Sequence, residues 1–293
     1  MTVSDLEGSE EYWLGRDYWA ASRLNLQHFM YKSAQKFLVH PVIQAHLRRE
    51  RESKETEDKA PQQIADLATG TGIWMFDLLN SQEVNGLDIQ YRGFDISGRL
   101  YPHDAWLPKG VSLSLSNLFE EPPQAFHGQF DLVHIRLVIA LVSDANPKKI
   151  IQHIKTLLKP GGYIQWDELD PINHHDIMTT GPEDQVPGLR AIFGPIRNLF
   201  DASWVEKIPK FLEEEGFQDA VQTQHEPPSE LFKAWAYMDL CVVDEFSRNG
   251  VGRQDKASAE RWRNMIPGAS AEIDSSGAVL KVCPTVTIAR KPL

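Results

Sequence analysis

A glycine-spaced turn between an apolar run and an apolar helical start constrains this chain more than any other feature. The stretch from Gln63 to Trp74 reads QIADLATGTGIW. This order predicts a strand, a tight loop and a helix, in which Gly70 and Gly72 let a ligand press against bare main chain. The segment therefore predicts a ligand-binding turn in an α/β fold.

Two common nucleotide-binding loops do not fit this segment. A dinucleotide loop of the G-x-G-x-x-G type needs a small residue where this chain has Met75, and Trp74 before it is also bulky. A phosphate-cradling Walker loop needs a Gly-Lys-Ser/Thr sequence, which does not follow. What remains is the pattern acid-x-small-x-Gly-x-Gly, which runs from Asp66 to Gly72.

Strands and helices alternate over the middle of the chain. Apolar or alternating runs predict five strands, at residues 64–67, 91–96, 111–115, 130–135 and 163–167. Helical spacing of apolar residues predicts helices at 73–79 and 147–158. Strands separated by helices indicate a parallel, doubly wound sheet that binds its ligand at the carboxyl ends of the strands.

The flanking regions lack this alternation. Helical spacing covers residues 12–47 with an interruption at Pro41, and residues 171–188 have the prolines and glycines of a surface loop. Further helices are expected at residues 189–200, 205–215, 230–246 and 257–265, and further strands at 220–224 and within 279–289.

The composition argues against several classes of partner. A formal net charge of −11 does not suit a nucleic-acid surface. Residues 1–11 are acidic and polar, unlike a secretory signal, and no apolar run approaches the roughly 20 residues of a membrane span. The two cysteines, Cys241 and Cys283, form no disulfide framework. The sequence predicts a cytoplasmic protein without a nucleic-acid or membrane partner, and it leaves the oligomeric state open.

Four blocks together resemble a known family. Residues 66–74, 93–97, 130–136 and 157–168 read DLATGTGIW, GFDIS, FDLVHIR and LLKPGGYIQWDE. They resemble the class I S-adenosyl-L-methionine (SAM) methyltransferases of fungal secondary-metabolite clusters. The block YWAASRLNLQH at residues 18–28 is similar to the N-terminal block of the gliotoxin-type N-methyltransferases.

The resemblance implies a fold, a domain order and an activity. The fold is α/β, a Rossmann-like seven-stranded class I methyltransferase sheet with a helical lid from N-terminal and C-terminal insertions. The domain order is a disordered tail at 1–11, a helical lid at 12–60, a SAM-binding core at 61–170, and the rest of the sheet with helical substrate-lid insertions at 171–293. The activity is SAM-dependent methyl transfer to nitrogen, or else oxygen or sulfur, of a small-molecule secondary metabolite.

The resemblance also implies which residues bind SAM. Asp66 would lie near its ammonium group, and Asp95 would accept both ribose hydroxyls unless it only caps the following turn. The implied cofactor-binding residues are Asp66, Ala68, Gly70, Gly72, Asp95, Ile96, Asn117, Leu118, Arg136, Tyr18 and Arg23. Two depart from the family pattern, because Ala68 replaces the usual first glycine and Asn117 replaces the usual aspartate.

Residues near the ends of the fourth and fifth strands are candidates for the reaction itself. His134 is the side chain best suited to accept a proton near neutral pH, with a buried structural histidine as an equal alternative. The expected substrate-binding residues are Trp166, Asp167, Glu168, Trp235 and Met238. The alternative for the first three is a cap for the following loop, and for the last two it is the apolar face of a docking helix. Neither the paired carboxylates nor the adjacent His174 and His175 has the spacing of a metal site, so no metal is expected.

Two other functions stay open at the level of sequence. A SAM-fold protein can act as a regulator inside a protein complex, and SAM can assist a rearrangement or cyclisation without methyl transfer. A fold alone does not decide between them, because function depends on the site. Product mass separates the enzymatic alternatives, since methylation adds a CH₂ unit and rearrangement adds nothing.

Overall fold

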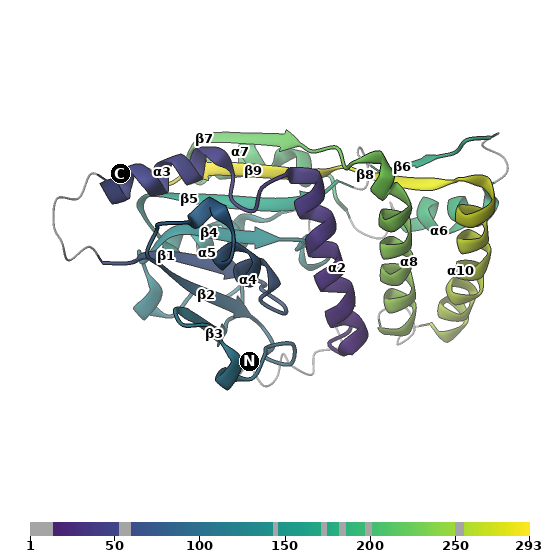
Figure 1. The fold of residues 1–293 in the computed structure, drawn as a ribbon, viewed down its shortest axis with the longest axis horizontal. Helices are drawn as coiled ribbons and strands as arrows, with labels where there is room; N and C mark the ends of the chain where they lie inside the picture. The colour runs from purple at the N-terminus through teal and green to yellow at the C-terminus, as the bar shows by residue number, and fades with distance from the viewer. Residues whose placement is uncertain are drawn as a thin grey trace.

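The computed structural model describes residues 14–52, 60–142, 146–170, 175–181, 186–196, 201–249 and 255–293. A seven-stranded sheet forms its centre (Figure 1). Its strands, in spatial order, are β3 (Val111–Leu115), β2 (Ile89–Asp95), β1 (Gln62–Leu67), β4 (Phe130–Arg136), β5 (Leu158–Leu169), β9 (Pro284–Arg290) and β7 (Gln218–Gln224).

The direction of the strands follows the predicted sheet. The first five strands along the chain pair in parallel, whereas β9 runs antiparallel to both β5 and β7. The strand order reverses between β1 and β4, where β1 leads to β2 on one side and β4 follows on the other. Ligands of open α/β sheets bind at the carboxyl ends of the strands at such a reversal. The structure thus confirms the class I methyltransferase sheet.

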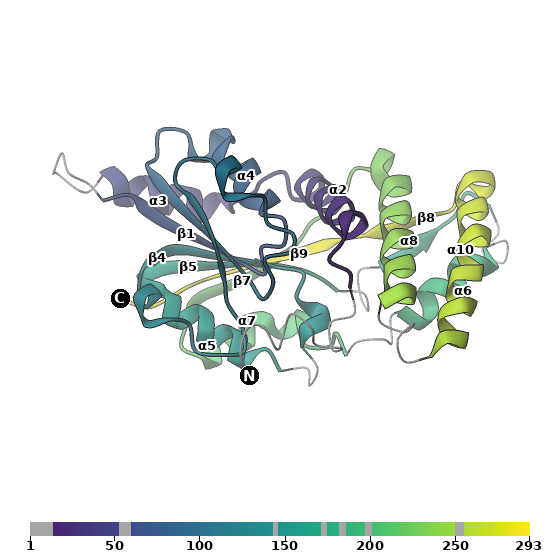
Figure 2. The ribbon, with the colours of Figure 1, turned by 90° about the horizontal axis from the view of Figure 1, so that it is seen from below.

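Helices cover both faces of the sheet (Figure 2). The helices α3 (Pro41–Glu52) and α4 (Ile73–Leu79) lie on one face, and α5 (Lys148–Leu157) and α7 (Ile208–Glu214) lie on the other. Successive strand residues point to opposite faces, so Ile64 packs among the residues of α3 and α4 while Ala65 packs among those of α5 and α7. This alternation determines which polar side chains of the sheet can contact one another.

A helical cap stands at the end of the sheet toward which β4 points (Figure 1). It consists of α6 (Pro187–Ile196), α8 (Phe232–Asn249) and α10 (Lys256–Ser276), with a two-stranded sheet of β6 (His175–Met178) and β8 (Val279–Val282). The helix α2 (Tyr18–Gln35) stands between the sheet and the cap. One apolar cluster joins α2 to the cap, and it includes Met30, Tyr31, Trp235 and Ile273.

Several elements differ from the sequence-based prediction. The stretch 171–188 was expected to be a surface loop, but it contains β6, whose pairing partner β8 lies near the other end of the chain. The last apolar run breaks at Cys283 into β8 and β9, which belong to different sheets. The expected helix 257–265 continues to Ser276, because Pro267 keeps a helical φ and removes only one N–H donor.

Other elements agree closely or fall outside the described residues. The helix α4 and the strand β3 have the predicted bounds. The strand β5 begins at Leu158, earlier than the predicted residue 163. The expected tail at 1–11 and His174 lie outside the residues that the structure describes.

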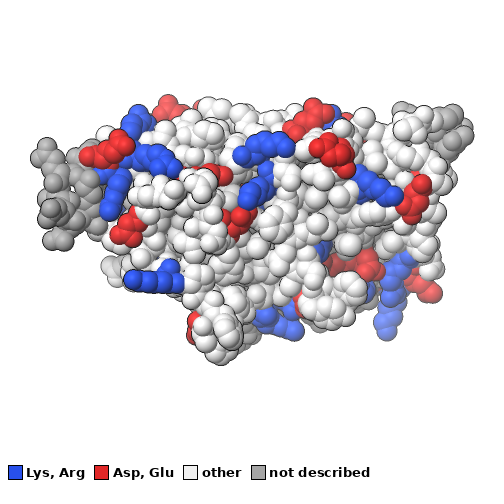
Figure 3. Space-filling view, in the orientation of Figure 1, with Lys and Arg blue, Asp and Glu red and all other residues white. Residues whose placement is uncertain are grey.

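The surface carries both signs of charge. On the face shown in Figure 3, basic and acidic side chains are interspersed, and no continuous basic track appears on it. Among the described residues, no helix is long and apolar enough to cross a membrane. Within the same residues, no group of three His, Cys, Asp or Glu side chains is arranged to hold a metal ion.

Candidate functional site

The glycine turn, residues 68–72, lies between the carboxyl end of β1 and the start of α4. Gly70 and Gly72 have φ values of 58° and 79°, in the left-handed region that glycine enters without strain. The helix α2 borders the turn, since the Thr71 hydroxyl donates to Asn25 Oδ1 at 2.7 Å. A Cβ atom on Gly70 would lie 3.4 Å from Leu24 of α2. The loop is therefore held in shape next to the N-terminal helix.

Asp95, at the end of β2, contacts the same turn. The Gly70 amide donates to Asp95 Oδ2 at 2.9 Å, and the Ser97 amide donates to Oδ1 at 3.2 Å. Burial raises the pKa of Asp95 above its ordinary value, although these two amides oppose the shift. Each carboxylate oxygen has a second lone pair for a further donor. The structure thus brings together two residues, Gly70 and Asp95, that were expected to bind one ligand.

Ala68 takes a conformation that glycine would adopt more easily. Its φ is 52°, again in the left-handed region. For a residue with a Cβ atom this region costs roughly 1–2 kcal/mol. The departure from the family glycine therefore places a Cβ atom on left-handed backbone and adds local strain.

The Asp66 carboxylate is directed into the protein. Its side chain accepts a hydrogen bond from Thr69 Oγ1 at 2.5 Å and pairs with His134 Nδ1 at 2.6 Å. Only 3% of Asp66 is exposed. In this arrangement Asp66 supports the loop through Thr69, and both of its oxygens are engaged by the protein.

His134 sits between two carboxylates on the face of the sheet that α4 covers. Its ring stacks on Trp74 with centroids 3.8 Å apart and an angle of 2° between the planes. Its Nε2 lies 3.3 Å from Asp167 Oδ2, opposite the Asp66 contact at Nδ1. Burial lowers the pKa of His134, but hydrogen bonds and charge from Asp167 and Asp66 outweigh it, so the pKa is raised. His134 is 1% exposed, and both ring nitrogens have protein partners.

The turn after β3 uses both ends of the Asn117 side chain. Asn117 Oδ1 accepts from the Phe119 amide at 3.1 Å, and Nδ2 donates to Glu120 Oε1 at 3.1 Å. Leu118 is buried in the apolar cluster on the α5 face, and Ile96 beyond β2 is half-buried. The oxygen of Asn117 keeps one lone pair, so its predicted contact with adenine stays a prediction.

Arg136, at the end of β4, faces α2. Its Nη1 lies 3.3 Å from His28 Nδ1, and its guanidinium lies 5.5 Å from the centre of the Tyr31 ring. His28 Nε2 contacts Asp77 Oδ2 at 2.9 Å. Burial lowers the pKa of His28 to about 4, and the Arg136 charge adds to the shift. His28 is therefore neutral, accepts from Arg136 and donates to Asp77.

The two α2 residues expected at the cofactor have different surroundings. Tyr18 is 72% exposed at the start of the helix. Arg23 is buried, and its Nε donates to Glu245 Oε2 of α8 at 2.6 Å. In the structure, Arg23 thus joins α2 to the cap through a carboxylate that lies far along the chain.

Trp166, Asp167 and Glu168, which were expected to bind the substrate together, do not share one face of the sheet. Neighbouring strand residues point to opposite faces, and Trp166 packs against Trp204 in the cluster on the α5 face. Asp167 faces the α4 side, toward His134. Glu168 accepts from the amides of Val138 and Leu169 at 3.0 Å each. Burial raises the pKa of Glu168 to about 8, although these hydrogen bonds oppose the shift.

The remaining substrate candidates lie where α2 meets α8. Trp235 and Met238 are fully buried in the apolar cluster of the cap, and the Trp235 ring lies 5.5 Å from the Tyr31 ring. Among the described residues, neither the Tyr31 hydroxyl nor Trp235 Nε1 has a hydrogen-bond partner. Burial raises the pKa of Tyr31 well above its ordinary value, and the Glu168 charge adds to the rise.

Sequence reasoning gave no site role to several residues in these contacts. Thr69 follows Asp66 by three positions in the loop, a spacing at which a hydroxyl can reach a carboxylate. Gln165 lies two positions before Asp167 in β5, and the strand period of two places both on one face. Tyr31 was visible only as a member of a helical pattern, and His28 as a member of that pattern and the last residue of the block at 18–28.

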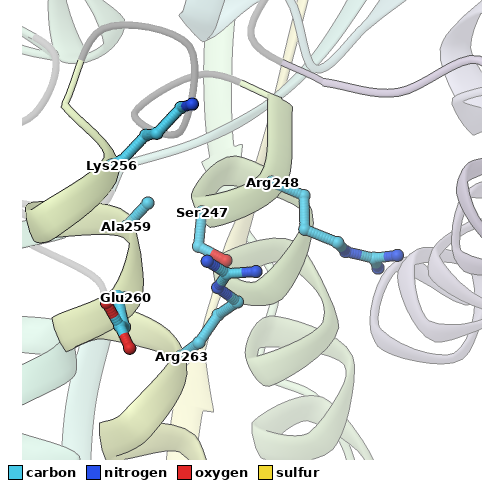
Figure 4. Close-up of a pocket in the computed structure, with 6 residues that line it drawn as sticks. All are labelled: Ser247, Arg248, Lys256, Ala259, Glu260 and Arg263. Carbon is cyan, nitrogen blue, oxygen red and sulfur yellow. The ribbon is translucent and has the colours of Figure 1, made fainter.

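One pocket lies away from this site. It has a volume of about 480 Å³ and lies where α8 ends and α10 begins, lined by Ser247, Arg248, Lys256, Ala259, Glu260 and Arg263 (Figure 4). Its charged side chains belong to the cap alone, and Arg248 points away from the other lining residues toward a neighbouring helix. No residue of the glycine turn or of the β1, β2, β4 or β5 strand ends lines it.

Comparisons with known proteins show the family of this chain. A family model described as a methyltransferase domain matches residues 40–202. Methyltransferase grgD of a Penicillium species is 37% identical over 111 residues, which are 36% of this chain and 38% of grgD. N-methyltransferase verN of Clonostachys rogersoniana is 30% identical over 217 residues, 73% of this chain and 68% of verN.

One of the solved structures similar to this chain has low sequence identity to it. Phosphoethanolamine N-methyltransferase 2 of Haemonchus contortus, in complex with SAM, superposes with a TM-score of 0.43 at 17% identity. The match covers 85% of this chain and 52% of that chain. The chain therefore spans well under half of grgD and about half of this structural neighbour.

Proposed function

The chain belongs to the methyltransferase-domain family, its cofactor is SAM, and we propose that it transfers a methyl group to nitrogen of a small-molecule secondary metabolite. The observation that carries the proposal is the contact between the Gly70 amide and the Asp95 carboxylate at 2.9 Å. It joins a bare main-chain turn to an acid at the carboxyl end of the neighbouring strand. We also propose a cytoplasmic location, as the sequence analysis expects.

The residues at this edge fit the cofactor. Gly70 and Gly72 present left-handed main chain without side chains, so a ligand can approach closely. The Asp95 oxygens have free lone pairs for two hydroxyl donors, which is what a ribose supplies. Asn117 and Leu118 follow β3 next to β2, on the side proposed for adenine. Arg136 offers a cation for the carboxylate of the amino-acid part.

The proposed substrate site lies between the ends of β4 and β5 and the helices α2 and α8. Its polar groups are the hydroxyl of Tyr31 and the indole N–H of Trp235, and both can donate hydrogen bonds. Buried donors without a partner are uncommon in proteins, and an acceptor on a bound ligand can satisfy them. A substrate with a carbonyl oxygen beside the reacting nitrogen would satisfy them.

Catalysis in this site rests on orientation. SAM supplies an electrophilic methyl group when bound. The chain's own residues hold the two reactants in line and exclude water, which accounts for most of the rate in such transfers. A reacting N–H must also lose its proton. The methylated nitrogen can release this proton to solvent as the product leaves, since Glu168 is fully buried and both of its oxygens already accept hydrogen bonds from the protein.

Cofactor binding tests the proposal first. Asp95→Ala should weaken S-adenosylhomocysteine binding in calorimetry by about tenfold or more, since hydrogen bonds to a charged group contribute roughly 1.5–3 kcal/mol. Asp104→Ala is the matched control, because Asp104 is an exposed acid in a short helix beyond β2. Equal affinities of the two variants would remove Asp95 from the site.

Product mass tests the reaction itself. The protein is incubated with SAM and candidate amides and amines, and the products are analysed by mass spectrometry. A CH₂ increment on nitrogen supports the proposal. An isomerised product of unchanged mass would favour SAM-assisted rearrangement, and cofactor binding without any turnover would favour a regulatory role.

A further inference from the structure

A continuous chain of hydrogen bonds leads from the glycine turn to the segment between α2 and α3. Thr69 Oγ1 donates to Asp66 Oδ2 at 2.5 Å, and Asp66 Oδ1 meets His134 Nδ1 at 2.6 Å. His134 Nε2 meets Asp167 Oδ2 at 3.3 Å. Asp66, His134 and Asp167 each lie on a different strand, so this chain of hydrogen bonds crosses the sheet from β1 through β4 to β5.

The far end of this chain is anchored to main chain. Gln165 Nε2 donates to Asp167 Oδ1 at 3.1 Å and to the Leu38 carbonyl at 2.9 Å. The Gln165 oxygen accepts from the His40 amide at 2.8 Å. Leu38 and His40 lie in the short link between α2 and α3. Gln165 thereby holds the Asp167 side chain in place, and Asp167 in turn holds His134.

The centre of the chain requires a charged imidazole ring. Both partners of His134 are carboxylate oxygens, which only accept, so each ring nitrogen must carry a proton. The charged groups that face the ring are Asp66 of β1 and Asp167 of β5, while α4 contributes the uncharged Trp74. A neutral ring would leave one buried carboxylate without its donor, which is costly in a buried site.

We propose that His134 is a positioning residue, which as a doubly protonated ring holds Asp66, and through it Thr69, so that the glycine turn keeps the shape that binds SAM. This inference rests on the proposed cofactor site at residues 68–72. It gives His134 a role other than proton transfer with the substrate, because both of its nitrogens are engaged inside the sheet.

A matched pair of variants separates the two ends of the ring. The amide nitrogen of asparagine lies near the place of Nδ1, and that of glutamine lies near the place of Nε2. His134→Asn therefore keeps the bond to Asp66, and His134→Gln keeps the bond to Asp167. Both lose the stacking on Trp74. His134→Gln should weaken S-adenosylhomocysteine binding about tenfold or more, while His134→Asn stays within about threefold of the natural protein.

The pH dependence of binding gives a second readout. Since the pKa of His134 is raised in the folded protein, the doubly protonated ring is present below that value and lost above it. Affinity for S-adenosylhomocysteine should thus fall as the pH rises through the pKa of His134. The ratio of the affinity of the natural protein to that of His134→Asn, taken at each pH, cancels the effect of titrating the ligand's own amino group.

Thr69→Val provides the check at the other end of the chain. This variant removes the hydroxyl that meets Asp66 and keeps His134 and its two partners. It should weaken binding and abolish the His134-dependent pH profile. Thermal melting of each variant confirms that it is folded before binding is measured.

The outcomes distinguish this inference from the proposed function. No binding of S-adenosylhomocysteine to the natural protein would overturn the proposed cofactor site. Binding by the natural protein together with equal losses in His134→Asn and His134→Gln would overturn the positioning role alone. A pH profile identical in the natural protein and His134→Asn would overturn it as well.

Discussion

The ion pair between Arg23 and Glu245 gives the sharpest test of how α2 is fixed to the cap. Arg23 Nε lies 2.6 Å from Glu245 Oε2, and the two side chains are 5% and 6% exposed. The Gly15 amide donates to the other oxygen at 2.6 Å, and Arg23 Nη1 donates to Gln27 at 2.9 Å. Glu245 thus joins Gly15 and Arg23 to α8 in a site with little solvent.

Glu245→Met removes the carboxylate and keeps the volume of the side chain. Arg23 is then buried without a counter-charge, and removing one partner of a buried pair costs about 3–5 kcal/mol in the free energy of unfolding. Arg23→Met should cost a similar amount, because it leaves Glu245 buried and unpaired. The double variant should recover most of this loss, since an apolar pair of similar volume is often as stable as the ion pair.

Chemical denaturation of the four proteins measures the coupling. A coupling energy of about 2 kcal/mol or more is expected from the double-mutant cycle, within the range known for residues in contact. Losses below about 1 kcal/mol for both single variants would show that the pair behaves as an exposed one, and the reasoning would fail. Calorimetry adds a second discrimination. A loss of S-adenosylhomocysteine affinity in Arg23→Met at unchanged stability would instead place Arg23 at the cofactor, as its sequence block implied.

Two further variants test local features of the site. Ala68→Gly should stabilise the protein by about 0.5–1 kcal/mol in chemical denaturation, because relief of a left-handed φ outweighs the extra freedom of glycine in the unfolded chain; a destabilised variant would show that Ala68 is unstrained. His28→Gln should make the free energy of unfolding less sensitive to acid. The pKa of His28 is about 4 in the folded protein and 6.5 in the unfolded chain, so His28 lowers the stability as the pH falls from 6.5 toward 4, by up to about 3 kcal/mol. The difference in unfolding free energy between natural protein and variant should be constant above pH 7, and a constant difference down to pH 4 would contradict the assignment.

Local patterns in the sequence were sufficient for the centre of the fold. The bounds of α4 and β3 follow from short apolar runs next to turn residues, and neither depends on a distant partner. Elements that depend on distant pairing were not predictable in this way. The strand β6 exists because β8 lies beside it, and the residues of β6 alone look like a loop.

The site shows the same division between local and distant information. Gly70 and Asp95 could be predicted to lie together, because Gly70 follows one predicted strand and Asp95 lies near the end of another in a parallel sheet. Arg23 was assigned to the cofactor, but its carboxylate partner lies 222 positions further along the chain, where no local pattern indicates it. Trp166 was misplaced for another reason. Successive residues of one strand were expected to share a site, although they point alternately to the two faces of the sheet.

The chain of hydrogen bonds through His134 lies between these two cases. Once the strands are ordered β1, β4, β5, the register pairs Asp66 with His134, and His134 with Gln165. The period of two then places Asp167 on the same face as Gln165. Four polar residues on one buried face of three adjacent strands must satisfy one another, since no solvent reaches them. The residues of the network can therefore be picked out in the sequence. Their contacts with one another depend on strand order and register, which only the folded structure shows. For the same reason a substitution at Gln165, remote from the glycine turn, should change the position of Thr69 as long as the hydrogen bonds between them are intact.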